Sequence, residues 1–111
     1  MADPNACPFV ATFELIRGKW TYCILVLLAE QTRGFNELLR LNPELTPKVL
    51  AQRLRELEED GIVSRRVVPT RPPSSEYGLS ALGHELLPLM LSIERWGRDY
   101  LAARQQPAIP A

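Results

Sequence analysis

The spacing of apolar and polar residues predicts three helices in the N-terminal part of the chain. Residues 8–17 carry apolar side chains at helical intervals and are followed by Gly18, so we expect a helix that ends there. Residues 20–29 are almost continuously apolar, which predicts a helix at the centre of the core. A short helix is expected over residues 35–41, closed by a turn over residues 42–45.

The segment after this turn carries clear signals for the start and the end of a helix. Thr46 offers a hydroxyl cap, and Pro47 has no backbone N–H to leave unpaired, so both suit the first turn. The helix is expected to run to residue 60, because Gly61 follows. Two helices joined by so tight a turn form a helix-turn-helix.

A β-hairpin is expected next. Residues 63–68 are rich in β-branched side chains and predict a strand, residues 69–75 form a proline-rich loop, and residues 76–79 return as a second strand. A hairpin in this position is a wing. The predicted fold is therefore mainly α with a small β-hairpin, a winged helix-turn-helix.

The last helix is expected to start after the cap Ser80 and to continue to about residue 104, with a kink at Pro88 and a frayed tail over residues 105–111. One interpretation lays this helix across its own domain. We favour a homodimer, because an exposed apolar patch of this size is unusual on a monomer. The candidate dimer residues follow a heptad spacing: Leu82, Leu86, Leu89, Ile93, Trp96 and Tyr100.

The length of 111 residues suits one domain. Within it we expect a DNA-binding core over about residues 19–79 and dimerisation helices over about residues 8–17 and 80–104. No apolar run is long enough to cross a bilayer and the N-terminus does not resemble a signal peptide, so a cytoplasmic protein without a membrane partner is expected. Two cysteines and one histidine cannot complete a zinc site, so we expect no metal and no cofactor.

The charge distribution is more informative than the net charge, which is zero and argues mildly against nucleic acid. Residues 31–55 hold five basic and two acidic residues, and residues 61–79 hold three basic residues and one acidic residue. Four acidic residues within the segment 56–60 offset most of that excess. A basic face separated from an acidic one still meets phosphates, because salt screens each charge beyond about 8 Å.

The helix after Thr46 has one face suited to DNA. At 100° per residue, Leu50, Leu54 and Leu57 form its core side, while Lys48, Gln52 and Arg55 lie opposite. Such a face is also what any solvated helix shows. The hairpin that follows favours the DNA interpretation, with base contacts near the start of the helix and phosphate contacts around it. The candidates for base contact are Lys48, Val49 and Gln52, and Arg53 and Arg55 are expected at phosphates. Arg65, Arg66 and Arg71 are expected to flank the site, with Arg71 held toward the backbone or the minor groove, and Thr46 completes the candidate DNA-binding set.

Several short motifs lie along the chain: Cys7-Pro8, Gly18-Lys19-Trp20 with Ile24-Leu25, Phe35-Asn36-Glu37-Leu38, Lys48-Val49-Leu50, the segment 54–63, Arg65-Arg66, Pro72-Pro73, Glu76-Tyr77, Leu82-Gly83 and Trp96-Gly97. Through these motifs the chain resembles the HxlR-type family of bacterial winged helix-turn-helix regulators. The resemblance covers about residues 7–97, and it implies a homodimer through the terminal helices on an inverted-repeat operator. It also implies that the cysteine of the Cys-Pro motif senses oxidants or electrophiles in some relatives. Gly34 and Gly78 depart from the family pattern.

The two cysteines are expected to differ. Cys7 falls at the N-cap of the first helix, where the helix dipole favours the thiolate, so it is the candidate redox sensor; the alternative is a buried packing residue. Cys23 lies in the most apolar helix and is interpreted as a small core residue.

Two other functional classes fit the residues less well. An enzyme is not expected, because the sole histidine, His84, has no partner at a catalytic spacing. The stronger alternative is a winged-helix module that binds another protein without binding DNA.

Overall fold

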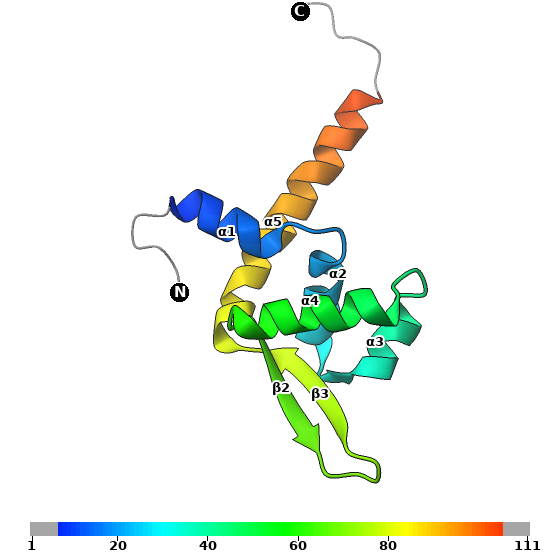
Figure 1. Ribbon diagram of the computed structural model, residues 1–111. Coiled ribbons are helices and arrows are strands. Elements are labelled where there is room, and N and C mark those ends of the chain that lie inside the picture. Colours follow the sequence, from blue (N-terminus) through cyan, green and yellow to red (C-terminus); the bar gives the residue numbers. More distant parts are fainter. Residues whose placement is uncertain (1–6, 106–111) are drawn as a thin grey trace, which may run out of the picture.

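The computed structural model describes residues 7–105 and has the predicted winged helix-turn-helix architecture. Every expected helix and the hairpin are present within about two residues of the expected bounds, and a short strand, β1, was not predicted. The frayed tail was expected over residues that lie almost entirely outside the described part of the chain. The elements in order are α1 (Pro8–Ile16), α2 (Thr21–Glu30), β1 (Arg33–Gly34), α3 (Phe35–Leu41), α4 (Pro47–Glu59), β2 (Val63–Val68), β3 (Ser74–Leu79) and α5 (Ala81–Arg104), as Figure 1 shows.

The core lies between α2, α3 and α4 and is closed by the start of β2 and by one side of α5. The apolar stripe predicted for α4 is its buried face, since Leu50, Leu54 and Leu57 are at most 2% exposed. Ile24, Leu25 and Leu28 meet it from α2 and Leu38 from α3. Burial of this stripe fixes which side of α4 remains at the surface.

The sheet has three strands in the order β1-β3-β2, all antiparallel. Arg65 pairs with Tyr77 and Arg66 with Glu76, so these two pairs project from opposite faces of the sheet. The wing projects away from the helical body (Figure 1).

The start of α5 is fastened to the junction of α4 and β2. The Ser80 hydroxyl accepts a hydrogen bond from the Gly83 N–H at 3.0 Å and reaches the carbonyl oxygens of Gly61 and Ile62 at 2.6 and 3.0 Å. Gly61 has φ +77°, a conformation that favours glycine, and it ends α4 as predicted. The position of α4 is thus tied directly to the root of α5.

The remainder of α5 extends beyond the body, and α1 lies across it (Figure 1). The Cα radius of gyration is 16.9 Å, against about 13 Å for a compact domain of this size. Pro88 lies inside the helix, which continues past it to Arg104. None of the helices within residues 7–105 combines the length and apolarity needed to cross a membrane.

The interpretation of Cys23 as a core residue is wrong, because its side chain is exposed. The buried residues of α2 are Thr21, Ile24, Leu25 and Leu28, and Cys23 lies about 150° around the helix from their centre. The nearly continuous apolarity of α2 hid which of its faces turns outward.

Candidate DNA-recognition site

The outward face of α4 carries the side chains predicted to read DNA. Lys48, Gln52 and Arg55 are all exposed, and they line a shallow groove together with Ala51 and two glutamates. Their side chains supply both donors and acceptors of hydrogen bonds, which base edges in the major groove require.

The start of α4 is held by the predicted cap. The Thr46 hydroxyl accepts a hydrogen bond from the Val49 N–H at 3.2 Å, and Pro47 occupies the first turn. Val49 is 38% exposed beside Lys48, so an apolar side chain suited to a thymine methyl group lies next to the polar ones. The cap orients the first turn, where base contacts are expected in a helix-turn-helix.

A hollow of about 190 Å³ separates α4 from the wing. It is lined by Arg55 and Glu58 from α4 and by Arg65 and Tyr77 from the sheet. The Arg65 Nε donates to the Ser75 hydroxyl at 3.0 Å, which orients its guanidinium. Arg55 and Arg65 therefore present two cations along one line from α4 to the wing.

The other two wing arginines are placed differently. Arg66 is on the opposite face of the sheet, where its Nη2 donates to the Glu76 carboxylate at 3.1 Å. Arg71 is exposed at the hairpin tip. The sequence suggested Arg65 and Arg66 as a pair, but the two-residue period of a strand separates them.

Arg53 lies away from the outward face. It is half-buried and pairs with Glu56 at 3.1 Å, and its Nε is buried without a hydrogen-bond partner among the described residues. Its guanidinium packs over Gly18, which turns between α1 and α2 with φ +111°. A side chain in this position holds α4 against the α1–α2 turn.

The acidic end of α4 is closer to the candidate residues than the sequence suggested. Glu56 accepts hydrogen bonds from Gln52 at 3.2 Å and from Arg53 at 3.1 Å. Glu58 lines the hollow between α4 and the wing, and Glu59 lines the groove on the outward face of α4; Arg55 lines both. Carboxylates therefore border the positive groups and reduce the positive potential beside them.

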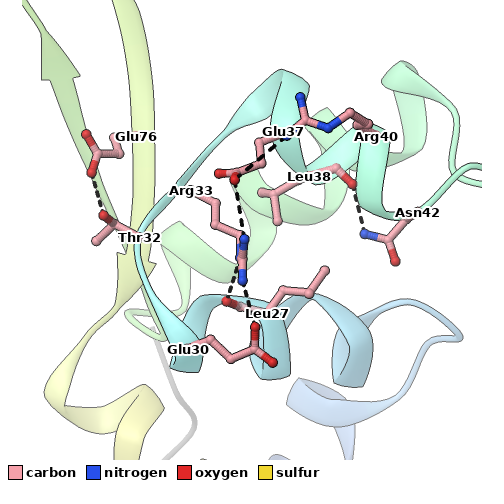
Figure 2. Close-up of polar contacts among 9 residues, drawn as sticks. All are labelled: Leu27, Glu30, Thr32, Arg33, Glu37, Leu38, Arg40, Asn42 and Glu76. Atoms are coloured by element: carbon pink, nitrogen blue, oxygen red, sulfur yellow. Dashed lines mark hydrogen bonds and ion pairs between the residues drawn. The ribbon is translucent and has the colours of Figure 1, made fainter.

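A buried arginine, which the sequence placed only among the basic residues of segment 31–55, fixes the angle between the helices before the wing (Figure 2). Arg33 is 8% exposed, and its guanidinium donates to the Leu27 carbonyl oxygen at 2.9 Å, to Glu30 at 2.7 Å and to Glu37 at 3.3 Å. These partners belong to α2 and α3. Because a buried charge requires such partners, the network locks the two helices together.

Glu76 ties the wing to β1. Its carboxylate accepts a hydrogen bond from the Thr32 hydroxyl at 2.5 Å and one from Arg66. These two hydrogen bonds, the one from Thr32 first, lower the pKa of Glu76 below its ordinary value of 4.5. The charged form of Glu76 therefore links β3 to β2 and to Thr32, the residue before β1.

Comparison with known proteins defines the family. Residues 15–105 match the model of the HxlR-like helix-turn-helix family. The chain belongs to this family of transcriptional regulators. Helix-turn-helix regulators bind DNA, which favours the DNA interpretation of α4 over a module that binds only protein.

Individual relatives agree with this assignment. This HxlR-type regulator is 39% identical over 98 residues to YdeP, an HTH-type transcriptional regulator of Bacillus subtilis strain 168, covering 88% of this chain and 77% of YdeP. Among solved structures it is similar to the redox regulator HypR in its reduced form, with a TM-score of 0.80, 38% identity and coverage of 87% and 99% of the two chains. It is also similar to diamide-treated YodB from B. subtilis, with a TM-score of 0.75, 30% identity and coverage of 86% and 96%.

This HxlR-type regulator exposes an apolar surface on its terminal helices. Phe9 is 76% and Trp96 is 68% exposed, and an open apolar groove of about 500 Å³ lies between α1 and α5. Five of the six predicted dimer residues are exposed, by 44% to 68%, whereas Leu86 is half-buried against the core. Cys7 is exposed at the N-cap of α1, next to this groove.

Proposed function

We propose that this regulator binds an inverted-repeat DNA operator in the cytoplasm as a homodimer, with α4 of each protomer in the major groove. The observation that carries the proposal is the exposed Lys48, Gln52 and Arg55 face on a helix whose opposite face is locked in the core. Lys48, Val49 and Gln52 contact base edges. The phosphate contacts come from the start of α4, the hollow and the wing: Thr46, Arg55, Arg65, Arg66 and Arg71.

The homodimer forms through α1 and α5. The exposed apolar surface includes the stacked pairs Phe9–Phe13 and Trp96–Tyr100. A second copy supplies the same surface in return, as a two-fold interface requires, and burying it removes apolar area from water. The two copies of α4 then lie about 34 Å apart, or a multiple of that distance, and reach successive turns of the duplex.

The salt dependence of binding tests the proposal. Of the arginines proposed to contact phosphates, Arg55, Arg65 and Arg71 form no ion pair within the described residues, which gives six such cations in a dimer, whereas Arg66 is already paired with Glu76. If each of the six neutralises one phosphate, log K falls against log salt with a slope of about −5. Binding that is insensitive to salt refutes the DNA interpretation.

A matched pair of variants locates the contact. Arg71→Ala at the wing tip is expected to weaken binding to all DNA sequences alike. It should also reduce the slope of log K against log salt by about two units per dimer, because one phosphate contact is lost in each protomer. Arg95→Ala removes the same charge from the exposed side of α5 that faces away from the predicted dimer residues, and it should leave the slope unchanged. Equal effects from both variants would point to net charge rather than to a specific contact.

We further propose that oxidation or alkylation of the Cys7 thiol weakens operator binding. Cys7 is exposed at the positive end of α1 and lies next to the proposed dimer surface, so a change there alters how the two protomers pack. The similarity to HypR and to diamide-treated YodB supports a response of this kind.

Because Cys23 is exposed as well, it provides the control. Operator affinity is measured before and after treatment with diamide or a quinone, in the wild type, Cys7→Ser and Cys23→Ser. Loss of affinity in the wild type and Cys23→Ser, but not in Cys7→Ser, is the expected result. An equal loss in all three proteins ends the idea.

A further inference from the structure

We propose that Glu56 is a positioning residue that fixes the side-chain amide of Gln52, so that this pair selects an adenine in each half of the operator. The inference rests on the proposed function and adds to it the identity of one base and the residue that imposes it. It starts from a hydrogen bond on the outward face of α4, between the Gln52 Nε2 and the Glu56 Oε1 at 3.2 Å.

The chemistry of the carboxylate determines which way the amide points. An ionised carboxylate only accepts hydrogen bonds, so the NH₂ group of Gln52 must face Glu56. The carbonyl oxygen of Gln52 and its second N–H are then left for another partner. A free glutamine side chain would present its two ends in either order.

Glu56 is itself held from the protein side. Its second carboxylate oxygen accepts a hydrogen bond from the Arg53 Nη1 at 3.1 Å. Arg53 is in turn half-buried over the Gly18 turn, so the chain of contacts begins on a fixed part of the fold. This series of contacts holds the Gln52 amide in one orientation.

Only one base offers the matching pattern in the major groove. Adenine presents an acceptor at N7 and a donor at N6, which complement the remaining N–H and the carbonyl oxygen of Gln52. Guanine presents two acceptors, so its O6 would face the Gln52 oxygen. Thymine offers an acceptor without a donor, and cytosine offers a donor without an acceptor. Adenine therefore satisfies both remaining groups.

The test uses the full-length protein and a pool of duplexes with a randomised core. Rounds of selection and sequencing give the base preference at each position, and titration of the enriched duplex with each of the four bases gives the affinity ratios. Gln52→Ala identifies the position read by Gln52. There, the wild type should prefer adenine by on the order of tenfold.

Glu56→Gln should weaken that preference several-fold. The new amide both donates and accepts, so Gln52 becomes free to take either orientation, and a base that offers only acceptors, such as guanine, then binds better relative to adenine. Glu59→Gln is the matched control, because Glu59 lies in the same groove and has no hydrogen bond to Gln52 among the described residues. It removes the same charge and should preserve the preference. Melting curves confirm that all variants are folded.

Three results overturn the inference. Selection of a base other than adenine at the Gln52 position refutes the recognition step, while DNA binding stands. An unchanged adenine preference in Glu56→Gln refutes the positioning step, and DNA binding stands in this case too. Failure to enrich any sequence, together with salt-insensitive binding, refutes the proposed function and this inference with it.

Discussion

The crossing of α5 over Ile62 gives a sharp test of how α4 and α5 are joined. A Cβ atom built on Gly83 lies 2.3 Å from the Ile62 carbonyl oxygen and 3.2 Å from a methyl carbon of Leu79. The Ile62 oxygen is also held by hydrogen bonds from the Ser80 N–H and hydroxyl, both at 3.0 Å. Gly83→Ala therefore forces two hydrogen-bonded backbone segments apart.

The change in the free energy of unfolding caused by Gly83→Ala is the difference between two costs and one gain. Overpacking of a close contact costs about 1–3 kcal/mol, and weakening one of the Ser80 hydrogen bonds costs about 1 kcal/mol. Alanine recovers about 1 kcal/mol over glycine through its higher helix propensity. We expect Gly83→Ala to lower the free energy of unfolding by about 2 kcal/mol, which for a domain of this size lowers Tm by about 10 °C.

Gly97→Ala is the control on the same helix. A Cβ atom at this position has nothing within 4 Å among the described residues, so alanine should stabilise α5 by up to about 1 kcal/mol. Urea unfolding, followed by circular dichroism at two protein concentrations, separates folding from self-association. A Gly83→Ala protein as stable as Gly97→Ala would refute the close packing of α5 on Ile62.

Three further predictions concern the groups that hold the helix-turn-helix and the wing. Arg33→Ala should reduce the free energy of unfolding by about 3 kcal/mol, measured in urea, because it leaves a backbone carbonyl and two carboxylates without their shared donor. The pKa of Glu76 is lowered in the fold by Thr32 and Arg66, so its contribution to stability is present above about pH 4.5 and is lost as the pH falls through the lowered pKa. Urea midpoints measured between pH 7 and pH 3 should therefore fall less in Glu76→Gln than in the wild type. Thr46→Ala should cost about 1 kcal/mol in the same assay by removing the cap of α4.

The sequence was sufficient where local signals determine the structure. Thr46, Gly61 and Ser80 mark helix boundaries through caps and a left-handed turn, which depend on neighbouring residues alone. Strand β1 was missed because two residues show no β periodicity, and it forms only where β3 supplies a partner. Cys23 was misplaced because a nearly uniform apolar helix does not reveal its buried side.

The sequence likewise predicted one part of the candidate site and missed another. The outward face of α4 follows from its 3.6-residue period, and its exposure matches the prediction. The contacts between side chains do not follow from that period. Arg33 and Arg53 were counted with the basic surface, yet one is buried between α2 and α3 and the other packs over Gly18. Long arginine side chains reach partners that only the tertiary fold brings near.

These contacts also explain how a protein of zero net charge retains a surface suited to DNA. Three of the five basic residues in segment 31–55 are paired with nearby glutamates, and only Lys48 and Arg55 lack an ion pair in the described structure. Arg66 is paired in the wing as well. The pairing removes charge from the interior and the flanks, so the remaining cations follow one line from α4 to the wing tip. Since salt screens charges beyond about 8 Å, a phosphate near this line responds to those cations and to the glutamates bordering α4, and the total charge of the chain has little influence.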